Sequence, residues 1–251
     1  MKNTLSIALI AALSVLLLGS AALATSSQTL TFDTDPQVGA SPTPSVWGVD
    51  RKAPAKFESR YFDGDNRLYM EHDGNAQDSD SFYWTEGRKL QIIGGNFAGE
   101  TKTVSADLYI DPAWNYSQTP TFAQQRRFDI WATLRDANGD VSAYPIIGYA
   151  HTLNQSEDDI DIEGFQVWDS DHWEQVMDLS TDDSLYGTWV SLKMEFSAGQ
   201  FDYSINDSLV YTDTTTNGST VIDNIIIQGK NYDGNQSYGV YWDNVTTPVP
   251  E

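Results

Sequence analysis

Residues 104–110 read VSADLYI, and this short stretch decides the class of fold. Apolar residues take every second position, and the positions between them hold Ser105, Asp107 and Tyr109. Successive side chains of a β-strand point to opposite faces, so this alternation predicts a strand with a core face and a solvated face. Strands of that kind are typical of antiparallel sheets that pack one face on a core.

The same two-residue period recurs outward from this stretch along most of the chain. Asp-Gly and Asn-Gly steps accept the positive φ angles of tight hairpin turns, and they begin at Asp63, Asp73, Asn138, Asn217 and Asp233. Two stretches, 36–54 and 112–125, look irregular. The sequence therefore predicts an all-β fold, a two-sheet antiparallel sandwich. Its strands are expected near 28–33, 57–62, 66–71, 88–93, 102–110, 127–135, 145–151, 164–169, 173–177, 188–196, 200–206, 208–213, 221–229 and 237–245.

The N-terminal segment differs from the rest in composition. Lys2 precedes an apolar run over 5–18, and Ala22 and Ala24 supply the small residues that a signal peptidase requires. A bilayer-spanning helix needs roughly 20 apolar residues, so this run is short for a membrane anchor. We therefore expect a secreted or cell-surface protein whose mature chain does not insert into a membrane. The expected organisation is a signal peptide over 1–24, one β-sandwich domain over 25–246 and a tail over 247–251.

The charge of the chain limits its partners. The sequence has 36 acidic and 14 basic residues, a formal net charge of −22. Without residues 1–24, which hold one lysine and no acid, the charge is 13 − 36 = −23. Such a negative field repels nucleic acids and anionic membranes, so neither is expected as a partner. There is no cysteine, so an exported domain must be stabilised by its core or by a metal rather than by disulfides.

Several predicted strands combine an aromatic ring with polar groups on the side away from their apolar residues. In 127–134 the apolar set opposes Arg127, Asp129 and Trp131, and in 164–168 it opposes Gln166 and Trp168. Aromatic rings stack on sugar faces while polar side chains bind hydroxyl groups. The primary prediction is a secreted, non-catalytic, lectin-like protein that binds a polysaccharide or another glycan. The predicted carbohydrate-binding face consists of Asp107, Tyr109, Arg127, Asp129, Trp131, Tyr149, His151, Gln166 and Trp168.

An acidic string supplies an enzymatic alternative. Asp159, Asp161 and Glu163 would share one face of a strand, where crowded carboxylates acquire separated pKa values. The string resembles the Glu-x-Asp-x-Glu signature of laminarinase-type retaining glycosidases, although Asp159 stands where that family has its nucleophilic Glu. This alternative predicts a glycoside hydrolase or a polysaccharide lyase. A further alternative is a structural matrix protein without a ligand.

Several segments together resemble a known group of proteins, and they lie at 31–33, 50–57, 62–68, 227–231 and 241–245. The chain resembles exported bacterial proteins with a concanavalin A-like, laminin-G-like jelly roll, many of which carry a C-terminal Pro-Glu-Pro (PEP-CTERM) sorting signal. The resemblance covers nearly the whole chain after residue 24 and implies a jelly-roll topology for the sandwich. Residues 249–251 are similar to the start of that sorting signal.

The resemblance also implies a metal. Related jelly rolls often hold a structural Ca²⁺ between the first strand and the last, and Ca²⁺ prefers carboxylate and carbonyl oxygen ligands. In this sequence the positions so implied are Asp33 and Asp243.

Overall fold

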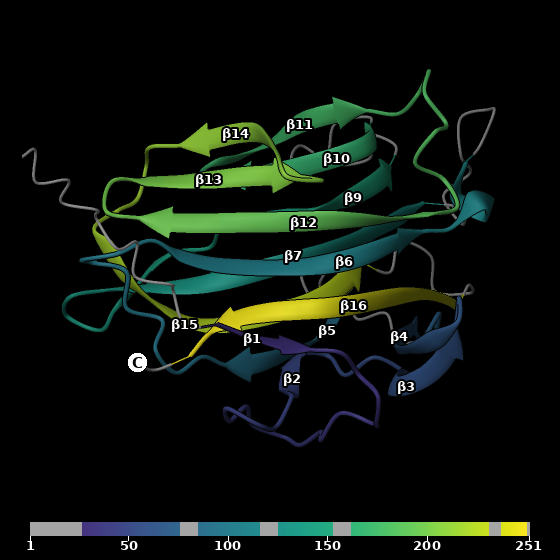
Figure 1. The fold of residues 1–251 in the computed structure, drawn as a ribbon, viewed down its shortest axis with the longest axis horizontal. Helices are drawn as coiled ribbons and strands as arrows, with labels where there is room; N and C mark the ends of the chain where they lie inside the picture. Colours follow the sequence, from purple (N-terminus) through teal and green to yellow (C-terminus); the bar gives the residue numbers. More distant parts are fainter. Residues whose placement is uncertain (1–26, 76–84, 116–124, 153–161, 231–236, 250–251) are drawn as a thin grey trace, which may run out of the picture.

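The chain folds as two stacked β-sheets (Figure 1). The computed structural model describes residues 27–75, 85–115, 125–152, 162–230 and 237–249. Within these ranges the strands are numbered β1 to β16, and a short 3₁₀ helix spans Pro112–Trp114. None of the helical segments in the described ranges is both long and apolar enough to span a bilayer.

One sheet, which we call the β6 sheet, has the strand order β14-β13-β12-β6-β16-β4-β3, and β1 pairs with β16 beside this path. All of its strand pairs are antiparallel. Its strands are β14 (Ser208–Asp213), β13 (Gln200–Ile205), β12 (Thr188–Ser197), β6 (Lys102–Ile110), β16 (Tyr238–Pro248), β4 (Asp65–His72), β3 (Lys56–Phe62) and β1 (Ser27–Leu30).

The second sheet, the β7 sheet, has the order β11-β10-β9-β7-β15-β5-β2, and β8 pairs with β7 beside this path. It is antiparallel as well. Its strands are β11 (His172–Asp178), β10 (Ile162–Asp169), β9 (Ile146–Thr152), β7 (Arg126–Asp136), β15 (Ser219–Lys230), β5 (Thr85–Gln91), β2 (Gly48–Arg51) and β8 (Val141–Ala143).

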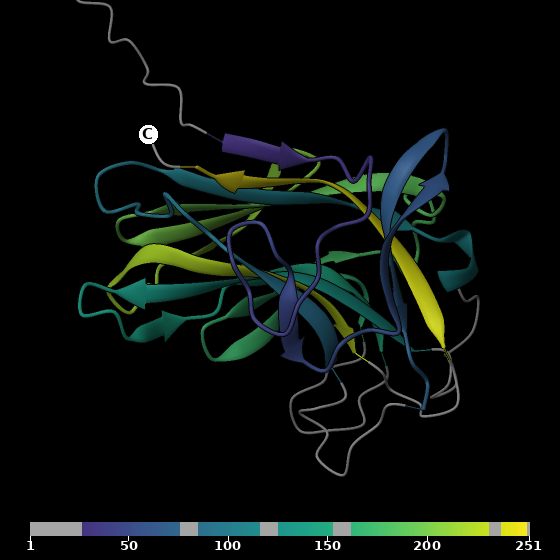
Figure 2. The ribbon, with the colours of Figure 1, turned by 90° about the horizontal axis from the view of Figure 1, so that it is seen from below.

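The core lies between the two layers, which Figure 2 shows from the side. The apolar face of β6 is fully buried there, and Phe128 and Ile130 of β7 meet it from the other layer with no exposed surface. Each large apolar side chain buried in this way contributes about 1.5–3 kcal/mol. The two-residue period therefore assigns the core faces of β6 and β7 correctly.

The predicted all-β fold, a two-sheet antiparallel sandwich, is confirmed. The expected strand 102–110 coincides with β6. Two strands were not expected: β2 lies inside the proline-rich stretch 36–54, and β8 is only three residues long. The last strand, β16, continues to Pro248, two residues past the expected end of the domain at 246.

Candidate functional site

A row of polar residues crosses the outer face of the β7 sheet, the face turned away from the core. Strand register places Gln228 of β15 opposite Asp129 of β7, and Asp129 opposite Gly148 of β9. Gly148 is in turn opposite Gln166 of β10, which is opposite Gln175 of β11. Residues opposite one another in register share a face, so this row runs across five neighbouring strands.

A second row, two residues further along the strands, is aromatic. Trp131 is opposite Ile146, Ile146 is opposite Trp168, and Trp168 is opposite Trp173. The rings of Trp168 and Trp173 have centroids 5.3 Å apart, and all three indoles are partly exposed. Two residues along a strand correspond to roughly 7 Å, so the aromatic row lies close beside the polar row.

The polar row is buried although it lies outside the core. The exposed fraction is 0% for Asp129, 1% for Gln228 and 3% for Gln166. An outer face of an antiparallel sheet is ordinarily solvated, and polar groups are usually withdrawn from water only when they are paired. A buried network of this kind beside open aromatic rings is the main sign of a functional site in the described residues.

Asp129 forms the centre of this network. Nε of Arg127 donates to its Oδ2 at 2.9 Å. Burial raises the pKa of Asp129, and hydrogen bonding and charge from Arg127 oppose that rise. A Cβ on Gly148 would lie 2.4 Å from Oδ1 of Asp129, so the absence of a side chain at Gly148 leaves room for this carboxylate.

Two arginines extend across the face and stack on indole rings. The guanidinium of Arg127 lies 3.9 Å from the ring centroid of Trp173, three strands away across the sheet. In register, Arg127 is opposite Ala150 of β9, which is opposite Gly164 of β10, so its neighbours on these two strands are small. Arg127 therefore links the polar row to the aromatic row.

Arg51 makes the corresponding link on the other side of Asp129. Its Nη1 donates to Oε1 of Gln228 at 2.9 Å and to Oδ2 of Asp50 at 3.2 Å, and its guanidinium lies 4.8 Å from the ring centroid of Trp131. Burial lowers the pKa of Arg51, Asp50 raises it and Arg127 lowers it further. The φ angle of Arg51 is +51°, a conformation that costs about 1–3 kcal/mol at a non-glycine residue.

Five of the nine residues expected on one binding face do lie together here, namely Arg127, Asp129, Trp131, Gln166 and Trp168. Asp107 and Tyr109 do not, because β6 pairs with β12 and β16 in the other sheet. Both side chains lie on the outer face of the β6 sheet, on the far side of the molecule. Their placement beside Arg127 and Trp168 was wrong.

Tyr149 and His151 were also expected on that outer face, and this expectation is wrong as well. Tyr149 is fully buried and His151 is 3% exposed. Tyr149 is opposite core-facing Phe128, and its ring stacks on Trp114 at 5.3 Å. Every residue of β9 is buried, so alternation of polarity cannot indicate its faces. Both residues belong to the space between the sheets.

Sequence reasoning missed several residues at this site. Trp173 and Gln175 lie on an expected strand, and alternation along 173–177 could have placed them opposite Trp168 and Gln166. Gln228 lies in one of the segments of family resemblance but carried no assigned role. Arg51 had no usable signal, because it lies in the proline-rich stretch and reaches the face only through its positive φ angle.

Of the three acidic residues in the enzymatic alternative, only Glu163 lies within the described residues. Asp159 and Asp161 lie outside the described residues. Glu163 is opposite His151 in register, so it faces the interior rather than the outer face. The hydroxyl of Tyr186 donates to Oε1 of Glu163 at 3.3 Å. Glu163 is therefore separated by the sheet from the rings of the aromatic row.

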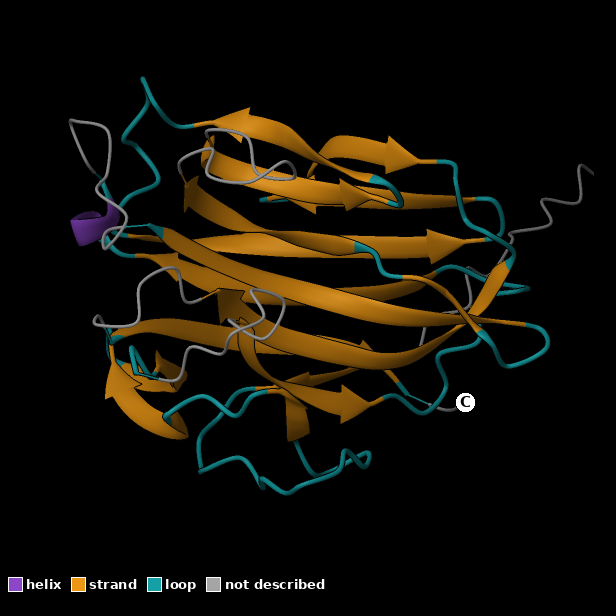
Figure 3. Cartoon of the chain, turned by 180° about the vertical axis from the view of Figure 1, so that it is seen from behind, coloured by secondary structure: helices purple, strands orange, loops and turns teal. Residues whose placement is uncertain are grey.

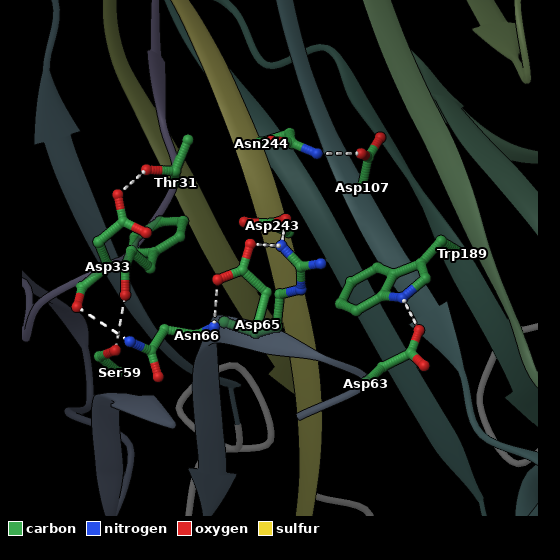
Figure 4. Close-up of polar contacts among 12 residues, drawn as sticks. Thr31, Asp33, Ser59, Asp63, Asp65, Asn66, Asp107, Trp189, Asp243 and Asn244 are labelled. Atoms are coloured by element: carbon green, nitrogen blue, oxygen red, sulfur yellow. Dashed lines mark hydrogen bonds and ion pairs between the residues drawn. The ribbon is translucent and has the colours of Figure 1, made fainter. Parts of the chain in front are cut away.

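The surroundings of Asp243 do not fit the calcium ion implied by the family resemblance. Arg67 forms an ion pair with Oδ2 of Asp243, and the same Nη1 lies 3.4 Å from Oδ2 of Asp65. Oδ2 of Asp33 accepts a hydrogen bond from Thr31 at 2.8 Å (Figure 4). Across the described ranges, no group of three or more His, Asp or Glu residues is gathered as a metal would require. A guanidinium already supplies the positive charge at Asp243.

Comparisons with known proteins identify the fold. No protein-family model and no curated protein matches the chain. Among solved structures, it is similar to the alginate lyase Aly36B in complex with an alginate trisaccharide, with a TM-score of 0.51, 12% identity, and coverage of 90% of this chain and 99% of that one. It is also similar to an endo-β-1,4-glucuronan lyase from the fungus Trichoderma reesei (TM-score 0.49, 12% identity, coverage 86% and 94%). A Bacillus licheniformis β-glucanase gives a TM-score of 0.46, 10% identity, and coverage of 89% and 98%. The chain spans only 17% of a sialidase that it also resembles.

These neighbours change the functional interpretation. They are named as lyases and a glucanase, and at 12% identity the likeness to the alginate lyase shows the fold alone. The prediction of a non-catalytic lectin is contradicted by this set, which favours the enzymatic alternative.

Proposed function

We propose that the protein is a polysaccharide-cleaving enzyme, a lyase or a glycoside hydrolase, whose substrate lies on the outer face of the β7 sheet. The observation that carries the proposal is the buried polar row beside the open row of indoles on that face. Figure 3 shows the strands of the molecule from behind, in the view opposite to that of Figure 1. The alginate lyase with the same fold holds a trisaccharide, which supports a glycan as the ligand.

The two rows have separate tasks in this proposal. Trp131, Trp168 and Trp173 are partly exposed and stack on the sugar rings, while Gln175 beside them offers an amide to hydroxyl groups. Asp129 is too deeply buried to touch a sugar, so it acts as a positioning residue that fixes Arg127. Groups held in this way keep the geometry that a transition state requires without moving during the reaction.

The test is a cleavage assay on a panel of polysaccharides that includes alginate, glucuronan and β-glucan. We expect shorter chains with new reducing ends on at least one of them. Elimination leaves an unsaturated sugar that absorbs ultraviolet light, whereas hydrolysis does not, so the same assay distinguishes a lyase from a hydrolase. A folded protein that shortens none of these chains contradicts the proposal.

A matched pair of variants connects the activity to this face. Trp168→Ala removes one ring of the aromatic row and is expected to lower the cleavage rate. Tyr61→Ala removes a ring that is 73% exposed on β3 of the other sheet and is expected to leave the rate unchanged. Equal rates for Trp168→Ala and the wild type would exclude this face as the site.

We also propose that the enzyme acts outside the cell. The support is the sequence of residues 1–24, which lie outside the described ranges, and not the structure. Mass spectrometry of the exported protein is expected to find Thr25 at its N-terminus. The similarity of residues 249–251 to the start of a PEP-CTERM sorting signal also favours export. Fractionation of cells and medium tests whether the protein is exported. A chain that retains Met1 and stays inside the cell contradicts both.

A further inference from the structure

Tyr144 lies in the connection between β8 and β9 of the β7 sheet, and it belongs to neither row of the functional site. Ala143 before it is opposite Leu134, whose side chain is fully buried in the core. Ile146 after it is opposite Trp131 of the aromatic row. Successive residues of an extended segment point to opposite faces, so Tyr144 and Ile146 share the outer face of the sheet.

The surroundings of the Tyr144 hydroxyl group agree with this placement. Burial lowers the pKa of Arg51, and Tyr144 is among the smaller influences that raise it. Asp223 raises the pKa of Arg135 most strongly, and Tyr144 adds to that rise. The hydroxyl group is therefore within electrostatic range of both guanidinium groups, and Arg51 is the arginine that stacks on Trp131.

The ring of Tyr144 is open to solvent. It is 46% exposed, the largest exposed fraction of any aromatic side chain on the described part of the β7 sheet. Within the described ranges its side chain has neither a hydrogen bond nor a ring contact. Tyr61 on the other sheet is also an exposed ring, but Tyr144 differs from it because it adjoins the aromatic row.

The aromatic row has a gap at β9, and Tyr144 lies beside that gap. The position in register between Trp168 and Trp131 is Ile146, which is only 2% exposed. Tyr144 lies two residues before Ile146 on the same face, roughly 7 Å along the strand direction. It therefore supplies the ring that the row lacks at this strand.

The four rings are spaced across the sheet at intervals that suit consecutive sugars. One ring comes from each of four neighbouring strand positions, and these are Trp173 of β11, Trp168 of β10, Tyr144 just before β9 and Trp131 of β7. Neighbouring strands lie about 4.8 Å apart, so the first and last of the four are about 14 Å apart. One strand spacing is close to the length of one sugar in an extended polysaccharide chain.

We infer that Tyr144 stacks on a sugar in the gap between Trp168 and Trp131, so that the face binds a run of about four consecutive sugars. This inference rests on the proposed function and names the substrate class by length. The substrate is a stretch of a long polysaccharide chain rather than a disaccharide. A disaccharide reaches only two of the four rings, and each further ring adds one stacking contact.

The experiment measures how affinity depends on the length of the ligand. Oligosaccharides of two to six sugars are prepared from alginate, glucuronan and β-glucan, and their binding to the protein is measured by calorimetry. We expect at least one series to bind, with an affinity that rises steeply up to about four sugars and changes little beyond that length. Tetrasaccharides that bind no better than disaccharides in every series, or no binding in any series, overturn the inference.

Two variants of Tyr144 and one control assign the contact, at a temperature at which all of them remain folded. Tyr144→Ala is expected to weaken binding of the tetrasaccharide roughly threefold to tenfold, the equivalent of one aromatic stack. Tyr144→Phe keeps the ring and is expected to bind like the wild type. Tyr61→Ala removes the exposed ring on β3 of the other sheet and is expected to leave the affinity unchanged. Wild-type affinity in Tyr144→Ala, or an equal loss in Tyr144→Phe, overturns the stacking contact.

The outcomes separate this inference from the proposed function. Length-dependent binding that needs Tyr144, without cleavage of any polymer, overturns the enzyme and retains the inference. Cleavage that falls in Trp168→Ala but not in Tyr144→Ala, with equal affinity for disaccharides and tetrasaccharides, retains the enzyme and overturns the inference.

Discussion

The two outer faces of the sandwich both carry aromatic residues, but they use them differently. On the β6 sheet, Phe62 stacks on Tyr241 at 3.9 Å and packs edge-on against Tyr109 at 4.8 Å. Asp63, in the turn after β3, accepts a hydrogen bond from Nε1 of Trp189 at 2.9 Å. The rings of this face are covered by the hairpin of β3 and β4, so they hold the hairpin on the sheet.

Arginines stack on rings of both faces, since Arg67 lies over Trp189 on the β6 sheet, but on the β7 sheet buried amides accompany them. Arg51 stacks on Trp131, Arg127 stacks on Trp173, and buried Gln228 and Asp129 hold the arginines. The hairpin of β10 and β11 also packs one ring on another, since the ring centroids of Trp168 and Trp173 are 5.3 Å apart. The comparison shows that aromatic content does not define a sugar site. The two faces differ in the buried row of Asp129, Gln228 and Gln166, which lies beside the rings of the β7 sheet.

The largest expected effect is on the stability of the whole sandwich, because it comes from a histidine in the core between the two sheets. His72 of β4 is fully buried beside Glu86, Arg126 and Tyr238, and burial lowers its pKa to about 3. In the unfolded chain His72 binds a proton near pH 6.5, whereas in the folded chain it stays neutral down to about pH 3. Stability therefore falls as the pH is lowered from 6.5, by up to about 1.4 kcal/mol per pH unit.

Urea unfolding at pH 6.5, 5.5 and 4.5 measures this dependence. His72→Gln is expected to flatten it over that range, whereas His172→Gln, at an exposed histidine on β11, is expected to leave the acid slope in place. An unchanged slope in His72→Gln would show that other groups cause the acid sensitivity. If cleavage is lost at a higher pH than the pH at which the protein unfolds, the cause is a titrating group at the active face and not His72.

The next effect separates activity from stability on the β7 face. Trp131→Ala removes a ring that contacts both the substrate and Arg51, so the cleavage rate is expected to fall roughly tenfold to hundredfold, equivalent to about 1.4–2.7 kcal/mol. Because the indole is only partly buried, a cost of about 1–3 kcal/mol in the free energy of unfolding is expected, and the rate is compared at a temperature where the variant remains folded. The rate and the thermal melt are measured on the same sample. A variant that unfolds readily but keeps the full rate would reverse the roles of the two faces.

The reciprocal change on the β6 face should affect stability alone. Phe62→Ala removes the ring stacked on Tyr241, and the expected cost is about 1–3 kcal/mol in the free energy of unfolding, because the ring is only partly buried. The cleavage rate at a temperature where the variant remains folded should equal that of the wild type. A reduced rate in folded Phe62→Ala would mean that the β6 face also takes part in catalysis.

The smallest effect concerns calcium. Because Arg67 already neutralises Asp243, neither Ca²⁺ nor EDTA is expected to change the melting temperature of the wild type. In Arg67→Met the buried carboxylate loses its cation, and added Ca²⁺ is expected to raise the melting temperature of this variant. Differential scanning calorimetry with and without Ca²⁺ checks both. Stabilisation of the wild type by Ca²⁺ would restore the metal site implied by the family resemblance.

The sequence was sufficient for the strands and insufficient for their partners. Alternation placed β6 at the correct residues and put Arg127, Asp129 and Trp131 on the correct face of β7. It could not show that β6 and β7 belong to different sheets, because pairing in a jelly roll joins strands far apart in the sequence. Tyr149 was misplaced because β9 is buried on both faces, and Arg51 was missed because its side chain direction depends on a positive φ angle.

The most direct test of the account is a crystal structure of the protein with a bound oligosaccharide from a polysaccharide that it cleaves. The account predicts sugar rings on Trp131, Trp168 and Trp173 of the β7 sheet. An oligosaccharide bound over Tyr109 and Trp189 on the β6 sheet, with the β7 face empty, would contradict it.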